Sequence, residues 1–147
     1  MKQTINKRLT LWLLTLALAV AALPALTAPA QAAKTPVNVV FGSETVTGEK
    51  ENPHGTTLVH CENVTYTLQN PDSSDPYYAA YTTWATGDVR IADTVDGKEV
   101  RKIRSGFGKG LTGKVTLGKN IRSLDYSVFS GGKLREVTIP ADSKLKR

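Results

Sequence analysis

The stretch VTLGKNIRSLDYSVFSGGKLREVTIPAD, residues 115–142, decides the interpretation of this sequence. It opens on Val-Thr-Leu at residue 115, and a similar triplet, Val-Thr-Ile, begins 22 residues later at residue 137. Alignment of residues 100–120 with residues 121–142 matches six apolar positions at nearly constant spacing. The matched pairs are Val100 with Ile121, Ile103 with Leu124, Phe107 with Phe129, Leu111 with Leu134, Val115 with Val137 and Leu117 with Ile139. This agreement indicates a repeated structural unit.

A period slightly above twenty residues is typical of leucine-rich repeats, in which each unit contributes one short strand. LREVTI, residues 134–139, has the L-x-x-L-x-L layout of such a unit. We expect Leu134, Val137 and Ile139 to point inward. One unit cannot bury an apolar face alone, so neighbouring units are expected to stack on each other.

Two segments of the second copy resemble the BspA-type leucine-rich repeats of bacterial and protist surface proteins. They are IRSLDYSVF at 121–129 and LREVTIP at 134–140. They are similar to that family's pattern of V-x-x-I-G-x-x-A-F, a short turn and L-x-x-V-x-I-P, although Asp125 replaces the glycine and Val128 the alanine. The resemblance extends over about residues 63–142. It implies a surface protein that functions in adhesion or in binding to host and matrix components.

The first 32 residues have the pattern of a secretory signal peptide. A basic start with Lys2, Lys7 and Arg8 precedes an apolar segment at 9–26, and Ala30-Gln31-Ala32 fits the cleavage sequence. An uncleaved membrane anchor is the alternative, because the apolar segment approaches the ~20 residues that span a bilayer. We therefore predict a secreted or cell-surface protein with no membrane span after cleavage.

Charge and cysteine content restrict the remaining chain. The whole sequence has 19 basic and 13 acidic side chains, and removal of the three basic residues among 1–32 lowers its formal net charge from +6 to +3. So small a charge gives no reason to expect nucleic-acid binding. Cys61 is the only cysteine, which excludes an internal disulfide. We expect it to be a small buried residue, with pairing between chains as the alternative.

The predicted fold class is mostly β: a short leucine-rich repeat solenoid with an N-terminal β cap, preceded by the signal peptide. Strand-like alternation occurs at 63–69, the aromatic and β-branched residues at 77–84 favour a second strand, and a shorter strand-like segment lies at 89–93. The expected domains are a signal peptide at 1–32, a polar leader or β hairpin at 33–62, the β cap with a first strand unit at 63–98, and leucine-rich repeats at 99–147.

A glycine-rich motif suggests nucleotide binding but lacks the required context. Gly108, Gly110 and Gly113 form a G-x-G-x-x-G pattern. A phosphate-binding loop must lead into a helix, whereas the strand-like segment KVTLG follows here. We interpret these glycines as turn residues and expect no cofactor.

Metal and catalytic motifs are also weak. His54, His60 and Cys61 do not have the spacing of a standard metal site, so no metal is predicted. A nucleophile–His–acid triad assembles in space, and sequence order alone does not exclude one. No G-x-S-x-G motif supports it, and we do not expect an enzyme.

The predicted function is a secreted or cell-surface leucine-rich repeat binding module for a protein or glycan ligand. The candidate binding residues lie between the inward strand positions and are Asp88, Arg90, Lys114, Thr116, Glu136 and Thr138. One alternative is a structural or display fragment of a longer repeat array, which would self-associate through its open C-terminal repeat. Another is a small carbohydrate-binding β module that uses Tyr81 and Trp84.

Overall fold

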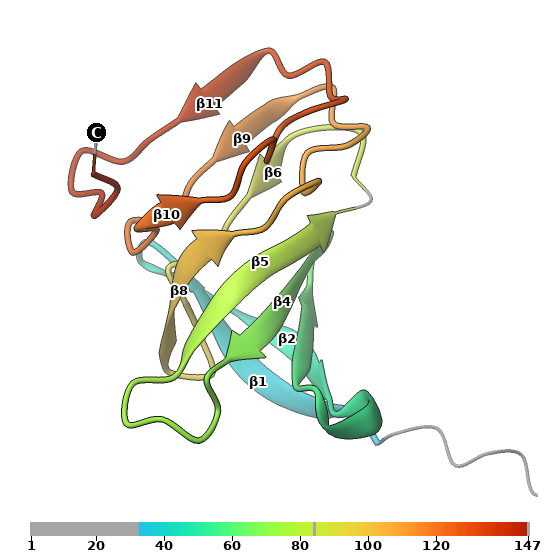
Figure 1. Cartoon of the computed structure of the whole chain (residues 1–147), viewed down its shortest axis with the longest axis vertical. Helices are drawn as coiled ribbons and strands as arrows, with labels where there is room; N and C mark the ends of the chain where they lie inside the picture. The colour runs from blue at the N-terminus through green and yellow to red at the C-terminus, as the bar shows by residue number, and fades with distance from the viewer. Residues whose placement is uncertain (1–32, 84, 147) are drawn as a thin grey trace, which may run out of the picture. The chain divides into compact units, whose positions relative to one another are not determined.

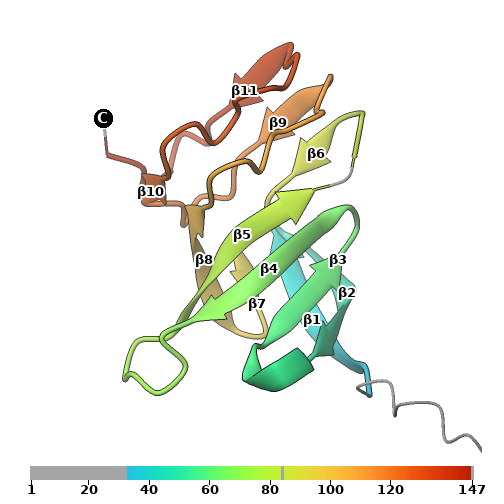
Figure 2. The ribbon, with the colours of Figure 1, turned by 45° about the vertical axis from the view of Figure 1, so that its right-hand side comes forward.

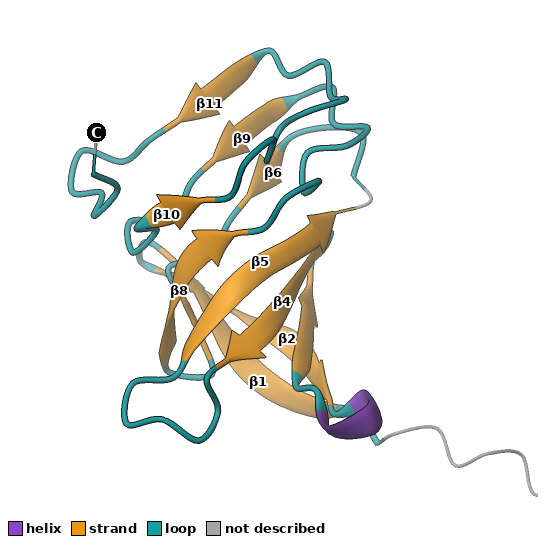
Figure 3. Ribbon diagram, in the orientation of Figure 1, coloured by secondary structure: helices purple, strands orange, loops and turns teal. Residues whose placement is uncertain are grey.

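Short strands dominate the computed structural model, which describes residues 33–83 and 85–146 (Figures 1 and 3). The described elements include one short 3-10 helix, η1 (Pro53–Gly55). The strands are β1 (Thr35–Phe41), β2 (Glu44–Glu51), β3 (Leu58–Cys61), β4 (Val64–Gln69), β5 (Tyr77–Thr83), β6 (Val89–Arg90), β7 (Thr94–Val95), β8 (Lys98–Ile103), β9 (Lys114–Thr116), β10 (Ser123–Leu124) and β11 (Glu136–Thr138).

Seven of these strands close into a β-barrel (Figure 2). Their order around the barrel is β8, β5, β4, β3, β2, β1 and β7, and β7 pairs with β8 to complete the ring. All neighbouring pairs are antiparallel except β5 and β8, which run parallel. Closure gives these strands partners on both sides, which removes the free edges that favour aggregation.

Alternation along the barrel strands produces its apolar core. Val39, Val59 and Tyr66 are fully buried members of one core cluster. The Tyr66 hydroxyl accepts a hydrogen bond from the backbone N–H of Ala92, which satisfies its polar group. Gly48 lies within β2 because a Cβ there would approach Val39 Cγ2 to 2.8 Å. A glycine inside this strand therefore serves close packing and does not break the strand.

A parallel stack of three rungs extends from one side of the barrel. We call β5 with β6 the first rung, β8 with β9 the second rung, and β10 with β11 the third rung. One ladder joins β5, β8 and β10, and the other joins β6, β9 and β11. Val89, Val115 and Val137 are directly paired along the second ladder. The first and second rungs share β5 and β8 with the barrel, so the barrel supports the stack.

The turns between the ladders also stack on one another. The N–H of Gly108 donates to Val128 O, and the N–H of Lys133 donates to Leu111 O. At Gly118, the second rung approaches the first so closely that an added Cβ would lie 2.3 Å from Ala92 O. These contacts make the stack a packed structure with no room for side chains at its closest points.

The predicted leucine-rich repeat solenoid with an N-terminal cap is wrong. The barrel runs from β1 to β8, across the limits expected at residues 62 and 98. Its closure depends on β7, a two-residue strand that pairs with both β1 and β8. The self-alignment did identify correct strand pairs, Val115 with Val137 and Ile103 with Leu124. These pairs extend a barrel and do not form a solenoid, and adhesion, which depended on that architecture, has no support here.

Residues 33–62 form the first three barrel strands, including the hairpin of β1 and β2. Cys61 is buried, as predicted, and burial is the main reason that the pKa of its thiol rises to about 11. No helix among the described residues is long and apolar enough to cross a membrane. The signal peptide predicted for residues 1–32 lies outside the described residues and stays a prediction.

Candidate functional site

The structure brings the six predicted site residues onto one face of the β6–β9–β11 ladder. Glu136 is paired with Lys114, Thr138 with Thr116, and Thr116 with Arg90. Asp88 directly precedes β6, and its Oδ1 accepts a hydrogen bond from the N–H of Lys114. A shallow cavity of about 310 Å³ is lined by Glu62, Asp88, Val89, Arg90, Lys114 and Thr116. The structure therefore brings these residues together on one face, and ligand binding by them stays a prediction.

The charges on this face are largely compensated within the molecule. Lys114 Nζ lies 3.0 Å from Glu136 Oε1, and Arg135 lies 3.5 Å from Asp88. The hydrogen bond from Lys114 is the main cause that holds the pKa of Glu136 below its usual value. Pairs this exposed contribute little to stability. They leave the face polar but without a dominant charge.

Arg90 is held by two glutamates that the sequence did not indicate. Its guanidinium pairs with Glu44 at the start of β2 and with Glu62 in the turn after β3, and lies over the ring of Phe41, 4.1 Å from the centroid. No local pattern connects these positions, because they are far from Arg90 in sequence. The contacts fix Arg90 against the barrel, so it is not a free cation for a ligand.

The third rung exposes apolar residues whose counterparts in the second rung are buried. Val137 is 39% exposed, whereas Val115, directly paired with it, is 0% exposed. The same contrast holds at two other matched positions: Leu124 is 40% and Ile139 49% exposed, against 0% for Ile103 and 2% for Leu117. The sequence predicted that Val137 and Ile139 are inward positions of a repeat, but no further strand among the described residues covers them.

The outer edges of the third rung have no strand partner in residues 33–83 and 85–146. β11 pairs only with β9, and β10 pairs only with β8 (Figure 1). The segment after β11 turns back to the second rung, where the N–H of Lys144 donates to Lys119 O. An edge strand of this kind presents unpaired N–H and C=O groups to a partner. The third rung therefore combines open backbone groups with exposed apolar side chains.

A second cavity, of about 350 Å³, lies between the barrel and the stack. Phe41, Asp93 and Lys119 are among the residues that line it. The buried carboxylate of Asp93 accepts hydrogen bonds from the N–H groups of Gly42 and Lys119, one at each oxygen. Asp93 thus joins the barrel to the stack, and its oxygens are already occupied.

Three consecutive barrel strands bring together the carboxylate of Glu51, the imidazole of His60 and the hydroxyl of Thr65. His60 Nε2 lies 2.9 Å from Glu51 Oε1, and His60 Nδ1 lies 3.1 Å from Thr65 Oγ1. Thr65 is only 3% exposed, and none of the three residues lines either cavity described above. A nucleophile must reach its substrate, so we interpret this arrangement as a cross-strand hydrogen-bond network.

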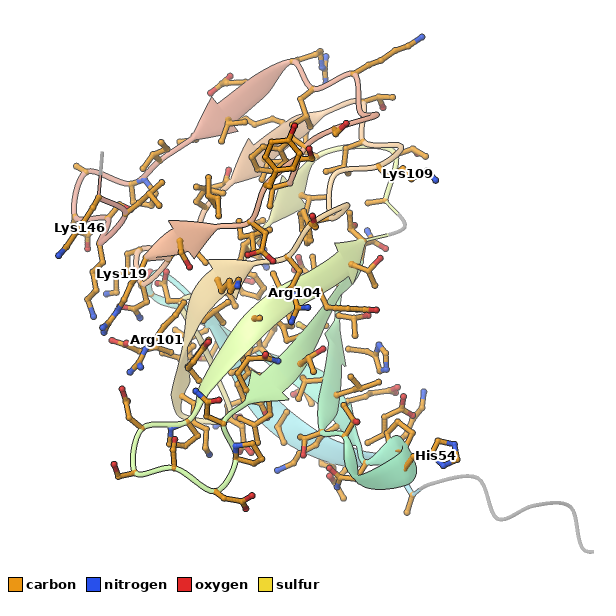
Figure 4. The ribbon with its side chains drawn as sticks, viewed as in Figure 1. His54, Arg101, Arg104, Lys109, Lys119 and Lys146 are labelled. Atoms are coloured by element: carbon orange, nitrogen blue, oxygen red, sulfur yellow. The ribbon has the colours of Figure 1, made fainter. Side chains whose placement is uncertain are left out.

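A cluster of cations surrounds Glu99 at the side of the stack. Arg101, Arg122 and Lys144 all contact its carboxylate, at 2.5–2.7 Å. Burial acts to raise the pKa of Glu99, but these hydrogen bonds and charges outweigh it and lower the pKa to about 2. Figure 4 shows Arg101 on the same side as Lys119 and Lys146, away from Lys109. The cluster ties the second rung to the third rung and to the C-terminal segment.

Features needed for other ligands are weak in the described residues. No group of three or more His, Cys, Asp or Glu side chains there could hold a metal ion. Tyr81 is half-exposed on β5, while Trp84, its partner in the carbohydrate-binding alternative, lies outside the described residues. No protein-family model, curated protein or solved structure matches this chain. The resemblance to BspA-type repeats is therefore still a prediction from sequence.

Proposed function

We propose that the protein is a polypeptide-binding module, which adds an extended segment of a partner protein to the outer edge of β11. The observation that carries the proposal is the contrast between Val137 and Val115, which have the same ladder position but different burial. A strand placed on β11 would cover Val137 as β11 covers Val115. The site then works by strand addition and needs no catalytic group.

Strand addition supplies both affinity and specificity. Main-chain hydrogen bonds give affinity, and the side chains at alternate positions select the partner. Full burial of a Val, Leu or Ile side chain is worth about 1.5–3 kcal/mol, so covering the exposed parts of Val137 and Ile139 contributes about 1 kcal/mol each. These terms together are suited to reversible binding of a short segment.

The edge is already ordered before a partner arrives. Three paired positions join β11 to β9, and the N–H of Leu117 in addition donates to Thr138 O. The second rung beneath it shares β8 with the barrel. A preorganised edge reduces the entropy that is lost on binding, since only the partner segment must become ordered.

The test uses the chain's own second-rung segment, GKVTLGKN at residues 113–120, as a capped synthetic peptide. In the parallel register of β9 and β11, this peptide would place its valine opposite Val137 and its leucine opposite Ile139. We expect saturable binding by calorimetry, with slower hydrogen exchange of the Val137 and Ile139 amides.

Two variants distinguish binding at the β11 edge from nonspecific hydrophobic association. Val137→Lys should abolish binding while the thermal melt stays cooperative. Tyr81→Ser removes another half-exposed apolar side chain, on the barrel, and should leave binding unchanged. Equal binding by wild type and Val137→Lys would contradict the proposal. So would light scattering that shows a stable dimer lost in Val137→Lys, because a second copy would then occupy the edge.

A further inference from the structure

The charge pattern along the stack points to the chemistry of the partner: we infer that the bound segment carries a basic residue opposite Glu136, immediately before the apolar residue that covers Val137. This inference rests on the proposed strand addition at β11. It specifies an extended cationic segment of the form basic–β-branched–x–aliphatic, in parallel register. Several observations on the third rung support this assignment.

Charge alternates in sign along the β6–β9–β11 ladder. Asp88 comes directly before β6, Lys114 begins β9, and Glu136 begins β11. The backbone N–H of Lys114 contacts the Asp88 carboxylate, and its ammonium group contacts Glu136. Opposite charges at directly paired positions stabilise a sheet, and like charges destabilise it. The next strand in this series would continue the alternation with a positive charge.

Glu136 has an unused carboxylate oxygen. Lys114 Nζ, at 3.0 Å, and Thr138 Oγ1, at 2.8 Å, both contact Oε1. Oε2 has no hydrogen-bond or ion-pair partner among the described residues, and the side chain is 57% exposed. Oε1 thus interacts with residues of the molecule's own ladder. The other oxygen is available to a cation that approaches from the open edge.

Asp125, directly after β10 on the opposite ladder, also contacts cations near the second rung but has no free oxygen. Its Oδ1 pairs with Lys102 at 2.7 Å, and its Oδ2 lies 3.4 Å from Arg104. Both of its oxygens are therefore engaged within the molecule. This difference assigns charge selection to Glu136 and makes Asp125 a suitable control position.

Arg135, the basic residue adjacent to Glu136 in the sequence, repels a cationic partner only weakly. Arg135 precedes Glu136, and its guanidinium pairs with Asp88 at the level of the first rung. That contact holds the positive charge of Arg135 towards β6, away from the open edge of β11. Lys133 lies before Arg135 in the exposed turn that leads to β11. Glu136 is the charged side chain within β11 itself.

The experiment compares two peptides that differ only in the charged position. GKVTLGKN, residues 113–120, places lysine opposite Glu136, and GEVTLGKN replaces that lysine with glutamate. We expect the lysine peptide to bind about fivefold more tightly at low salt, as opposite and like cross-strand pairs differ by about 1 kcal/mol. The ratio should fall towards one in 1 M NaCl, where charge interactions are screened.

Protein variants identify the residue that selects. Glu136→Gln should remove the preference, and Glu136→Lys should reverse it in favour of the glutamate peptide. Asp125→Asn should retain the wild-type preference. Equal binding of both peptides to the wild type would overturn the inference but leave strand addition intact. Binding of neither peptide would overturn both, and a preference that survives in Glu136→Gln would assign the selection elsewhere.

Discussion

The second and third rungs have closely similar apolar residues at matched positions, but they experience different environments. Val115 and Val137 are paired in one ladder, yet only Val115 is covered by a further strand. Leu117 and Ile139 show the same difference. In a stack, burial of a side chain thus depends on the rung above it as much as on its own identity. A residue that reads as core in the sequence is surface at the end of the stack.

The largest expected effect comes from separating the second rung from the first. Gly118→Ala places a methyl group 2.3 Å from Ala92 O, where only backbone could move away. We expect a loss of about 3–4 kcal/mol in the free energy of unfolding, among the larger values for single substitutions. Urea denaturation measures it. Gly87→Ala is the control, because its added Cβ has open space; a similar loss there would show that the close approach is not the cause.

A smaller effect compares matched leucines in the two rungs. Leu111→Ala removes a fully buried side chain and should cost about 3 kcal/mol, whereas Leu134→Ala at the half-buried position should cost about 1 kcal/mol. Chemical denaturation of both variants gives the ratio. Equal losses would mean that the third rung is as well covered as the second in solution.

The next effect concerns the charges that link the two rungs. Burial acts to raise the pKa of Glu99, but Lys144, Arg101 and Arg122 lower it from 4.5 to about 2. A carboxylate with a depressed folded-state pKa stabilises above its unfolded pKa and loses that contribution as the pH falls towards the folded value. Allowing for solvent screening, Glu99→Gln should cost about 1–2 kcal/mol at pH 7.

The difference between Glu99→Gln and wild type should shrink between pH 4.5 and about 2. Denaturation midpoints measured across this range test the sign. A difference that stayed constant with pH would show that Glu99 acts through packing rather than charge. Lys146→Gln, an exposed substitution close in sequence to Lys144, provides a control that should change neither midpoint nor pH profile.

The smallest effect on stability is expected at Glu136, where the comparison separates stability from binding. The side chain is exposed and paired only at one oxygen, so Glu136→Gln should leave the thermal melting midpoint unchanged within error. The same variant should lose the preference between the lysine and glutamate peptides. A clear fall in the melting midpoint would mean that Glu136 holds the third rung in place.

The repeat could be predicted from the sequence but the barrel could not, for physical reasons. Alternation at 63–69 and the aromatic and β-branched residues at 77–84 predicted β4 and β5, since each strand is long enough to show such a signal. By contrast, β7 has two residues, too few to show any period. Gly48 and the charged residues of β2 obscure its strand pattern in the sequence. Tertiary closure therefore depended on signals that no local pattern contains.

The candidate site was predictable in its positions but not in its energetics. Spacing placed Lys114 and Glu136 on one face, and the structure pairs them. Spacing could not show that Glu44 and Glu62 from the barrel hold Arg90, because these contacts join residues distant in sequence. It also could not show which oxygen of Glu136 is free, since this depends on the Thr138 rotamer as well as on Lys114.

Closure of the barrel by β7 has a consequence for how the chain folds. Val39 in β1 pairs with Val95 in β7, which is synthesised much later. Until then, this edge of β1 has no strand partner. The intervening loop carries an entropic cost, and pairings between distant segments form slowly. We expect this seam to be rate-limiting in folding, with β1 transiently exposed to other nascent chains. A chaperone or a slow translation rate would then influence yield through a strand pairing of only two residues.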